Sequence, residues 1–214
     1  MQPNLRQSAP PYFRYTLALL SRFPNFDQPF IGMLRRKAVD SLKLSAGNRV
    51  LDVGCGTGAS FPHLLSAVGN SGEVVGVEIS PDVAELAERR IQQNRWTNVR
   101  VVVGDARTVV LNGKFDGLLL FGAPDIYASP DAITNLRRYL NDSARVVAFG
   151  SKLTKRRFGA GLNIVLKLLM KLSFASTPGL NYEPWTPLGA YLGDVRVQEY
   201  IYGGFFLASG SLRR

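Results

Sequence analysis

The stretch that decides the fold is Val50-Leu51-Asp52-Val53-Gly54-Cys55-Gly56-Thr57-Gly58. Its apolar start predicts a buried strand, and the three glycines after it allow the backbone to bend and to approach a ligand closely. A helix is expected to begin near Ala59, with free N–H groups at its first turn. A strand, a glycine turn and a helix in this order predict a ligand site at the carboxyl end of a parallel sheet.

Outward from this stretch, short apolar runs alternate with longer helical patterns, which is typical of a parallel sheet with crossover helices. Two further strands near the end of the chain fit a hairpin that turns at Gly203-Gly204. The sequence therefore predicts an α/β fold. We expect strands at 49–53, 73–78, 99–103, 115–121, 144–149, 194–201 and 204–209, and helices at about 59–68, 81–94 and 130–140.

Two segments flank this core. Residues 1–45 hold an aromatic run and a helix whose apolar side chains recur every three or four residues, and we expect them to form an N-terminal lid. Residues 159–174 read as an apolar helix with Asn163, Lys167 and Lys171 along one line. This helix fits a pocket lid, a core element or a membrane contact. We expect one domain, 1–214, with a cofactor-binding core at 46–150 and a substrate-side helix and hairpin at 151–214.

The composition limits the class of protein. At 214 residues the chain fits one domain, and 26 basic against 16 acidic side chains give a net charge of +10. Such a charge favours encounter with phosphate, nucleic acid, anionic lipid or an acidic partner. Cys55 is the only cysteine, which excludes an intramolecular disulfide. With no secretory signal and no long apolar run, we expect a cytoplasmic protein, with a position at the periphery of a membrane as the alternative. We expect no metal site.

The glycine turn alone fits two ligands. Gly54, Gly56 and Ala59 also satisfy the dinucleotide pattern, and Glu78 lies where either ligand would present a ribose. Asp52 favours a ligand that carries an ammonium group, because a carboxylate would sit badly beside a pyrophosphate. None of the eight tyrosines has a lysine four residues later, so a common hydride-transfer pair is missing.

Four motifs in order resemble those of the class I S-adenosylmethionine-dependent methyltransferases. They are Leu51–Gly58, Val74–Ser80, Gly104-Asp105-Ala106 and Phe115–Leu120, and the resemblance covers about residues 47–150. It implies S-adenosylmethionine as the cofactor. It also implies a Rossmann-like, mostly parallel sheet of seven strands, with helices on both faces and an antiparallel C-terminal strand.

The resemblance assigns a role to each motif residue. Asp52, Gly54 and Gly56 would hold the methionine end, with Thr57 and Gly58 completing the turn. Glu78 would bind the ribose hydroxyls, and Ile79 would pack on the adenine. Asp105 and the Ala106 N–H would read the adenine edge. We also expect Phe121, at the end of the fourth strand, to contact the cofactor.

The acceptor side is less defined, because methyl transfer depends on alignment of the reactants and requires no particular catalytic residue. Asp125 and Tyr15 are the catalytic candidates. Residues expected to contact the acceptor are Tyr12, Tyr127, Tyr182 and Trp185. His63 is a weaker candidate base, because it lies a full turn into the helix after the glycines. We interpret Cys55 as a small buried residue rather than a nucleophile.

Three functional hypotheses follow from these residues. The first is methyl transfer to N, O or C of a hydrophobic small molecule. The second is a lipid or quinone methyltransferase of the phosphatidylethanolamine or ubiquinone type that acts at a membrane surface. The third is a binding module without catalysis. Nucleic acid is a disfavoured substrate, because Gly122-Ala123-Pro124-Asp125 replaces the Asn-Pro-Pro-Tyr type of signature.

Overall fold

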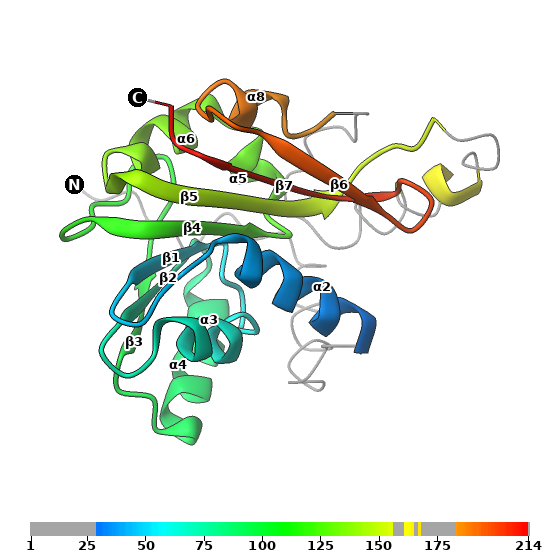
Figure 1. Ribbon diagram of the computed structural model, residues 1–214. Coiled ribbons are helices and arrows are strands. Elements are labelled where there is room, and N and C mark those ends of the chain that lie inside the picture. Colours follow the sequence, from blue (N-terminus) through cyan, green and yellow to red (C-terminus); the bar gives the residue numbers. More distant parts are fainter. Residues whose placement is uncertain (1–28, 156–160, 165–166, 168–182, 214) are drawn as a thin grey trace, which may run out of the picture.

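A computed structural model describes residues 29–155, 161–164, 167 and 183–213. It contains a seven-stranded sheet in the order β3-β2-β1-β4-β5-β7-β6 (Figure 1). The first five strands of this order are parallel, whereas β7 runs antiparallel to both of its neighbours. The predicted α/β fold with an antiparallel C-terminal strand is therefore confirmed.

The apolar runs located the parallel strands well. The strands are β1 Arg49–Val53, β2 Glu73–Glu78, β3 Val99–Val103, β4 Phe115–Phe121, β5 Leu140–Ser151, β6 Arg196–Tyr200 and β7 Phe205–Ser211. The fifth strand, expected at 144–149, is longer at both ends. Its first residues pair only with β4 and include the exposed Asp142 and Ser143, so no apolar run marks that extension.

Helices cover both faces of the sheet (Figure 1). One face packs against Leu34, Phe61 and Ala87 from three helices, and the other against Ile133 and Leu188 from two more. The helices on the first face are α2 Pro29–Ser41, α3 Phe61–Val68 and α4 Pro81–Asn94. Those on the second face are α5 Pro124–Tyr127, α6 Pro130–Arg137 and α8 Thr186–Gly189.

The bounds of two helices differ from the expected ones. Helix α3 begins after Ser60 rather than at 59, and α6 ends at Arg137 because β5 begins at Leu140. Of the helix expected at 159–174, residues 161–164 and 167 are helical and the others lie outside the described residues. Residues 1–28 of the expected lid also lie outside them. Within the described ranges, no helix is long and apolar enough to span a membrane.

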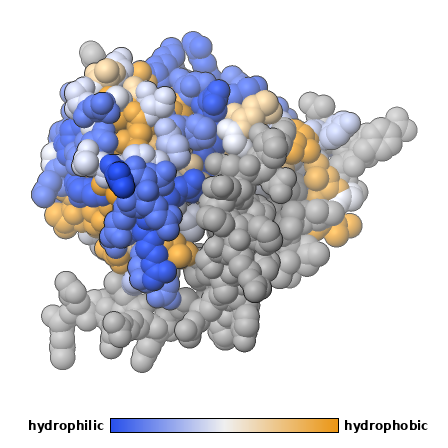
Figure 2. Space-filling model, turned by 90° about the horizontal axis from the view of Figure 1, so that it is seen from below, coloured by the Kyte–Doolittle hydropathy of each residue, from blue (hydrophilic) through white to orange (hydrophobic). Residues whose placement is uncertain are grey.

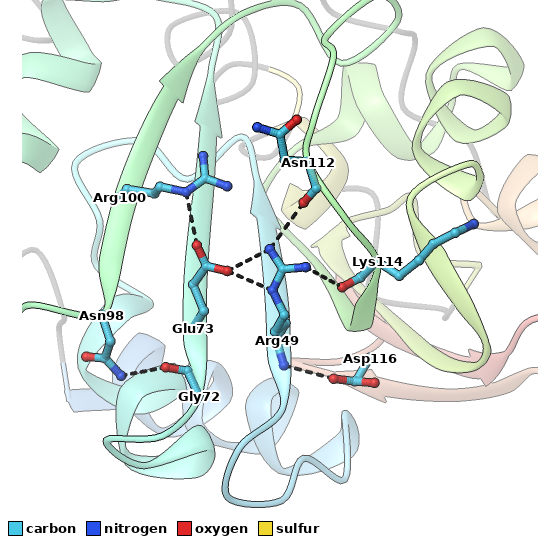
Figure 3. Close-up of polar contacts among 8 residues, drawn as sticks. All are labelled: Arg49, Gly72, Glu73, Asn98, Arg100, Asn112, Lys114 and Asp116. Atoms are coloured by element: carbon cyan, nitrogen blue, oxygen red, sulfur yellow. Dashed lines mark hydrogen bonds and ion pairs between the residues drawn. The ribbon is translucent and has the colours of Figure 1, made fainter.

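A polar network fastens the amino ends of four strands (Figure 3). Arg49 on β1 contacts Glu73 on β2 at 2.7 Å, and Arg100 on β3 contacts the same carboxylate at 3.0 Å. The Arg49 backbone N–H also donates to Asp116 on β4 at 2.8 Å. Partial burial opposes ionisation of Glu73, but the hydrogen bonds from both arginines outweigh it and lower the pKa of this carboxyl. The network fixes the strand register at the edge opposite the glycine turn.

The predicted hairpin turn occupies residues 201–204 between β6 and β7. Ile201 and Tyr202 have φ values of 46° and 52°, and Gly203 follows at 78°. Side chains other than glycine rarely adopt this left-handed conformation, and a β-branched residue is the least suited to it. The turn is therefore strained at two residues whose side chains are exposed, 39% for Ile201 and 77% for Tyr202.

Candidate functional site

The glycine turn lies at the carboxyl end of β1 and has the conformation that its glycines allow. Gly54, Gly56 and Gly58 have φ values of 73°, 57° and 76°. A Cβ atom at Gly54 would lie 2.9 Å from the Ala123 Cβ, so the close approach of the turn to α5 requires glycine there. A Cβ atom at Gly56 would meet no atom within 4 Å, which leaves open space over the middle of the turn.

Asp52 lies beneath this turn, on a strand in the middle of the sheet, and is only 1% exposed. Its Oδ2 atom is buried and has no hydrogen-bond partner among the residues that the structure describes. Burial raises the pKa of Asp52 to about 7, although Arg35 and a hydrogen bond from Ser60 oppose the rise. A buried carboxylate oxygen without a partner is costly, and such a group marks a functional site when it lies where a ligand binds. It suits a cationic ligand group.

Arg35 links helix α2 to this site. Its Nη1 atom donates to the Ser60 Oγ at 2.8 Å, and its guanidinium lies 4.2 Å above the centre of the Phe121 ring. Phe121 ends β4 and stacks on Phe149 with a centroid distance of 4.4 Å. The positive charge of Arg35 lowers the pKa of Asp52 and partly offsets the burial of that carboxylate.

Glu78 ends β2 and joins the glycine turn to the start of α4. Its Oε2 accepts a hydrogen bond from the Gly56 N–H at 3.1 Å, and its Oε1 accepts one from the Ser80 N–H at 3.0 Å. Burial raises the pKa of Glu78, and the charge of Asp125 raises it further against those two donors. Glu78 therefore shapes the turn in addition to presenting a carboxylate beside it.

The expected adenine contacts occupy the next loops. Ile79 is 48% exposed at the carboxyl end of β2, a position that suits a flat apolar ligand. Asp105 is held by Arg107, whose Nε donates to Oδ1 at 2.9 Å, and this hydrogen bond lowers the pKa of Asp105. Ala106 is buried beside α6. Their assigned cofactor roles stay predictions.

Asp125 is exposed in the first turn of α5. Desolvation by the surrounding protein raises its pKa, and the charge of Asp105 raises it further. Asp125 also raises the pKa of Glu78, so the structure brings three acids together at this edge of the sheet. The charge of Asp125 therefore lies near those of Glu78 and Asp105, the two acids expected to bind the adenosine part of the cofactor. A catalytic role for Asp125 stays a prediction.

The residues expected to contact the acceptor have different positions. Trp185 is half-buried and packs on Phe206 with a centroid distance of 5.0 Å. Tyr127 is instead a core residue, 1% exposed, packed edge-on against Phe206 at 5.5 Å. Desolvation raises the pKa of its hydroxyl, and its burial in the core argues against the expected contact with an acceptor. The other two, Tyr12 and Tyr182, lie outside the described residues, as does the catalytic candidate Tyr15.

Three further side chains near the sheet are Cys55, His63 and Lys152. Cys55 is 7% exposed and burial raises the pKa of its thiol, as expected for a packing residue rather than a nucleophile. His63 is half-buried on α3. Lys152 is also buried, at 6% exposed, and its Nζ lies 2.5 Å from the Glu199 carboxylate.

Two residues of the site were not predicted from the sequence, Arg35 and Ser60. The apolar spacing of α2 indicated its buried face but gave no reason to single out the arginine at the edge of that face. Ser60 directly precedes an apolar helix, a position typical of a cap, but its side chain makes no capping hydrogen bond and turns to Arg35 instead.

Comparison with known proteins identifies the domain. The family model described as "Methyltransferase domain" matches residues 44–166. The aklanonic acid methyltransferase DauC of Streptomyces sp. (strain C5) is 32% identical over 134 residues, which cover 61% of this chain and 60% of that protein. A demethylmenaquinone methyltransferase of Staphylococcus saprophyticus is 30% identical over 118 residues, which cover 53% of this chain and 48% of that protein. The matches thus span about half to three fifths of these relatives.

Among solved structures, an S-adenosylmethionine-dependent methyltransferase from Aquifex aeolicus superimposes with a TM-score of 0.66. It is 19% identical in sequence, and the match covers 93% of this chain and 98% of that chain. At this identity the likeness concerns the fold alone.

Proposed function

Because the chain belongs to the class I S-adenosylmethionine-dependent methyltransferase family, we propose that it transfers a methyl group from S-adenosylmethionine to N, O or C of a hydrophobic small molecule. The observation that carries this proposal is the buried Oδ2 of Asp52, which has no hydrogen-bond partner in the described part of the chain and lies beneath the glycine turn. The ammonium group of the cofactor would supply the missing partner.

The other residues fit the rest of the cofactor. Glu78 would accept hydrogen bonds from the ribose hydroxyls, and the open space at Gly56 would leave room for the ligand above the turn. The exposed Ile79 would pack on the adenine. When bound, S-adenosylmethionine would supply the methyl group of its sulfonium for in-line attack by the acceptor atom, and S-adenosylhomocysteine would be the leaving group. The protein therefore contributes mainly alignment and exclusion of water.

A row of aromatic rings supports a hydrophobic acceptor. Phe121 stacks on Phe149 at 4.4 Å, and Phe149 stacks on Phe205 at 5.9 Å, so the rings cross the ends of three neighbouring strands. Phe121 and Phe205 are half-buried. Flat apolar side chains beside a cofactor site favour an apolar or aromatic acceptor over a sugar or a small polar acid.

A second candidate is a lipid or quinone acceptor that is methylated at a membrane surface. The similarity to a demethylmenaquinone methyltransferase and the net charge of +10 favour it. The chemistry would be the same, and only the place where the acceptor is met would differ.

The proposal is tested by incubating the protein and methyl-labelled S-adenosylmethionine with lipid and aqueous extracts of the source cells. We expect label in a small organic-soluble product, and no label with the Asp52→Asn variant. Label confined to protein or nucleic acid would contradict the proposed acceptor class. Cofactor binding without labelling of any fraction would instead support a binding module that has no catalysis.

A further inference from the structure

The β6–β7 turn and the helix containing residues 161–164 meet at one end of the molecule (Figure 1). Two sets of hydrogen bonds join them through Thr154. The Thr154 Oγ1 donates to the Tyr202 carbonyl at 2.7 Å. The Asn163 side chain accepts from the Thr154 N–H at 2.9 Å and donates to the Thr154 carbonyl at 3.1 Å. The turn and the helix are therefore held in a fixed relation.

This junction exposes large apolar side chains instead of burying them. Ile164 is 68% exposed, Tyr202 77% and Ile201 39%. Asn163, expected on the polar line of the helix, contacts Thr154, and the neighbouring Ile164 lies in solvent. In Figure 2 hydrophobic surface appears at the right-hand end of the molecule, the end at which the turn and this helix lie in Figure 1.

The conformation of the turn makes this exposure notable. Asparagine and glycine are the residues that a turn with two left-handed positions favours, yet Ile201 and Tyr202 occupy them. Neither contributes to a core cluster. The strained backbone therefore presents two apolar side chains to the outside, and an unfavoured residue in such a conformation points to a function for its side chain.

Two exposed lysines flank this surface. Lys155 directly follows Thr154 and is exposed, and Lys167 lies one helical turn beyond Asn163 and is also exposed. Glu199, the acid on the adjoining strand, is paired with Lys152 at 2.5 Å. Protruding apolar side chains, a tyrosine and flanking lysines match the chemistry of an anionic bilayer surface, where apolar groups enter the acyl boundary and lysines meet the headgroups.

We propose that Ile164, Ile201 and Tyr202, flanked by Lys155 and Lys167, form a docking surface for anionic membranes. The set is called the hairpin-tip surface below. It would bring the protein to the layer in which a hydrophobic acceptor resides. Membrane docking needs no bound cofactor, so it can be tested separately from the methyl transfer proposed above.

The test uses the whole protein and phosphatidylcholine vesicles, with and without phosphatidylglycerol, in a co-sedimentation assay at an ionic strength of about 0.15 M. The informative variant carries Ile201→Asn and Tyr202→Gly together. Asparagine and glycine suit the left-handed turn, so this variant removes both apolar side chains while favouring the same backbone. The matched control is Val110→Asn, which removes another exposed apolar side chain, 80% exposed, between β3 and β4.

We expect the wild type and the Val110→Asn control to bind the anionic vesicles equally. The turn variant should bind about tenfold more weakly or worse, because burying one large apolar side chain alone is worth about that factor. Substituting Lys155 or Lys167 by Gln should weaken binding about fivefold each, and only on vesicles that contain phosphatidylglycerol. Thermal stability and S-adenosylmethionine affinity should not fall in any of them.

Two results would overturn the proposal. One is a wild type that binds neither kind of vesicle, which would leave the hairpin-tip surface to a protein partner. The other is a turn variant that binds as well as the wild type. Should the turn variant be less stable than the wild type, Ile164→Asn tests the same surface from the helix, and binding equal to the wild type would count against the proposal in the same way.

Discussion

Replacing Asp52 by Asn should make the protein without cofactor more stable at neutral pH and less able to bind S-adenosylmethionine. Burial raises the pKa of Asp52 from 3.8 to about 7. Below pH 4 the carboxyl is protonated in the folded and the unfolded state, so it contributes nothing to the pH dependence. Between pH 4 and 7 the unfolded chain releases the proton while the folded chain keeps it, so stability falls as pH rises.

The size of this effect follows from the same pKa values. At about 1.4 kcal/mol for each pH unit, the ionisation of Asp52 costs the folded state about 4 kcal/mol by pH 8. An Asn side chain has no charge to form, so the variant lacks this loss. The stability difference between variant and wild type should therefore grow by about 4 kcal/mol from pH 4 to pH 8, or about 10 °C in melting temperature for a chain of this size.

Urea unfolding followed by circular dichroism at a series of pH values measures this difference. The remaining titrating groups are shared by both proteins, so their contribution cancels. Asp82→Asn is the matched control, because it removes a carboxylate that is exposed at the start of α4. The free energies of unfolding of the variant and the wild type would be compared at each pH. If their difference stays constant or shrinks from pH 4 to pH 8, ionisation of Asp52 does not destabilise the folded state, and the reasoning is refuted.

Three further outcomes follow from the contacts of the site. Glu78→Ala should weaken S-adenosylmethionine binding about 10- to 100-fold in a calorimetric titration, since it removes a charged acceptor of hydrogen bonds, and unchanged affinity would show that the acid has another role. Cofactor affinity should fall at low pH, where Asp52 is protonated. Arg35→Met should raise the pKa of Asp52 and so move this fall to higher pH, as measured by titrations at several pH values. A move to lower pH would contradict the electrostatic role of Arg35. Tyr202→Gly should raise the stability by about 1 kcal/mol in urea unfolding because it relieves a left-handed side chain, and a loss of stability would show that the turn is not strained.

The parallel part of the sheet was predictable because each strand is a short apolar run between turn residues. Four strands have the expected bounds, from Arg49–Val53 to Phe115–Phe121. The first residues of β5 were missed, since Asp142 and Ser143 are exposed and follow the neighbouring strand without an apolar signal. Hydrophobic patterns report burial, and they do not report pairing at an exposed end of a strand.

The site was predictable where a motif fixes it and not where a distant element completes it. Asp52 lies on β1 just before the glycine turn, and Glu78 ends the neighbouring strand β2, as the motifs implied. Arg35 reaches the same place from α2, a contact across 25 residues of sequence to Ser60 that no local pattern contains. Tyr127 was expected in the site but is buried in the core. An aromatic residue after a strand gives the same sequence pattern whether it lines a pocket or fills the core.

The most direct test of the central claim is a calorimetric titration of the wild type and of Asp52→Asn with S-adenosylmethionine at pH 6, in buffers with different heats of ionisation. A pKa of about 7 means that Asp52 is mostly protonated at pH 6 without the cofactor. The account predicts saturable binding at one site, with release of nearly one proton per cofactor as the ammonium displaces it, and loss of both in the variant. Absence of saturable binding to the folded wild type, or equal affinity and no proton release in the two proteins, would contradict it.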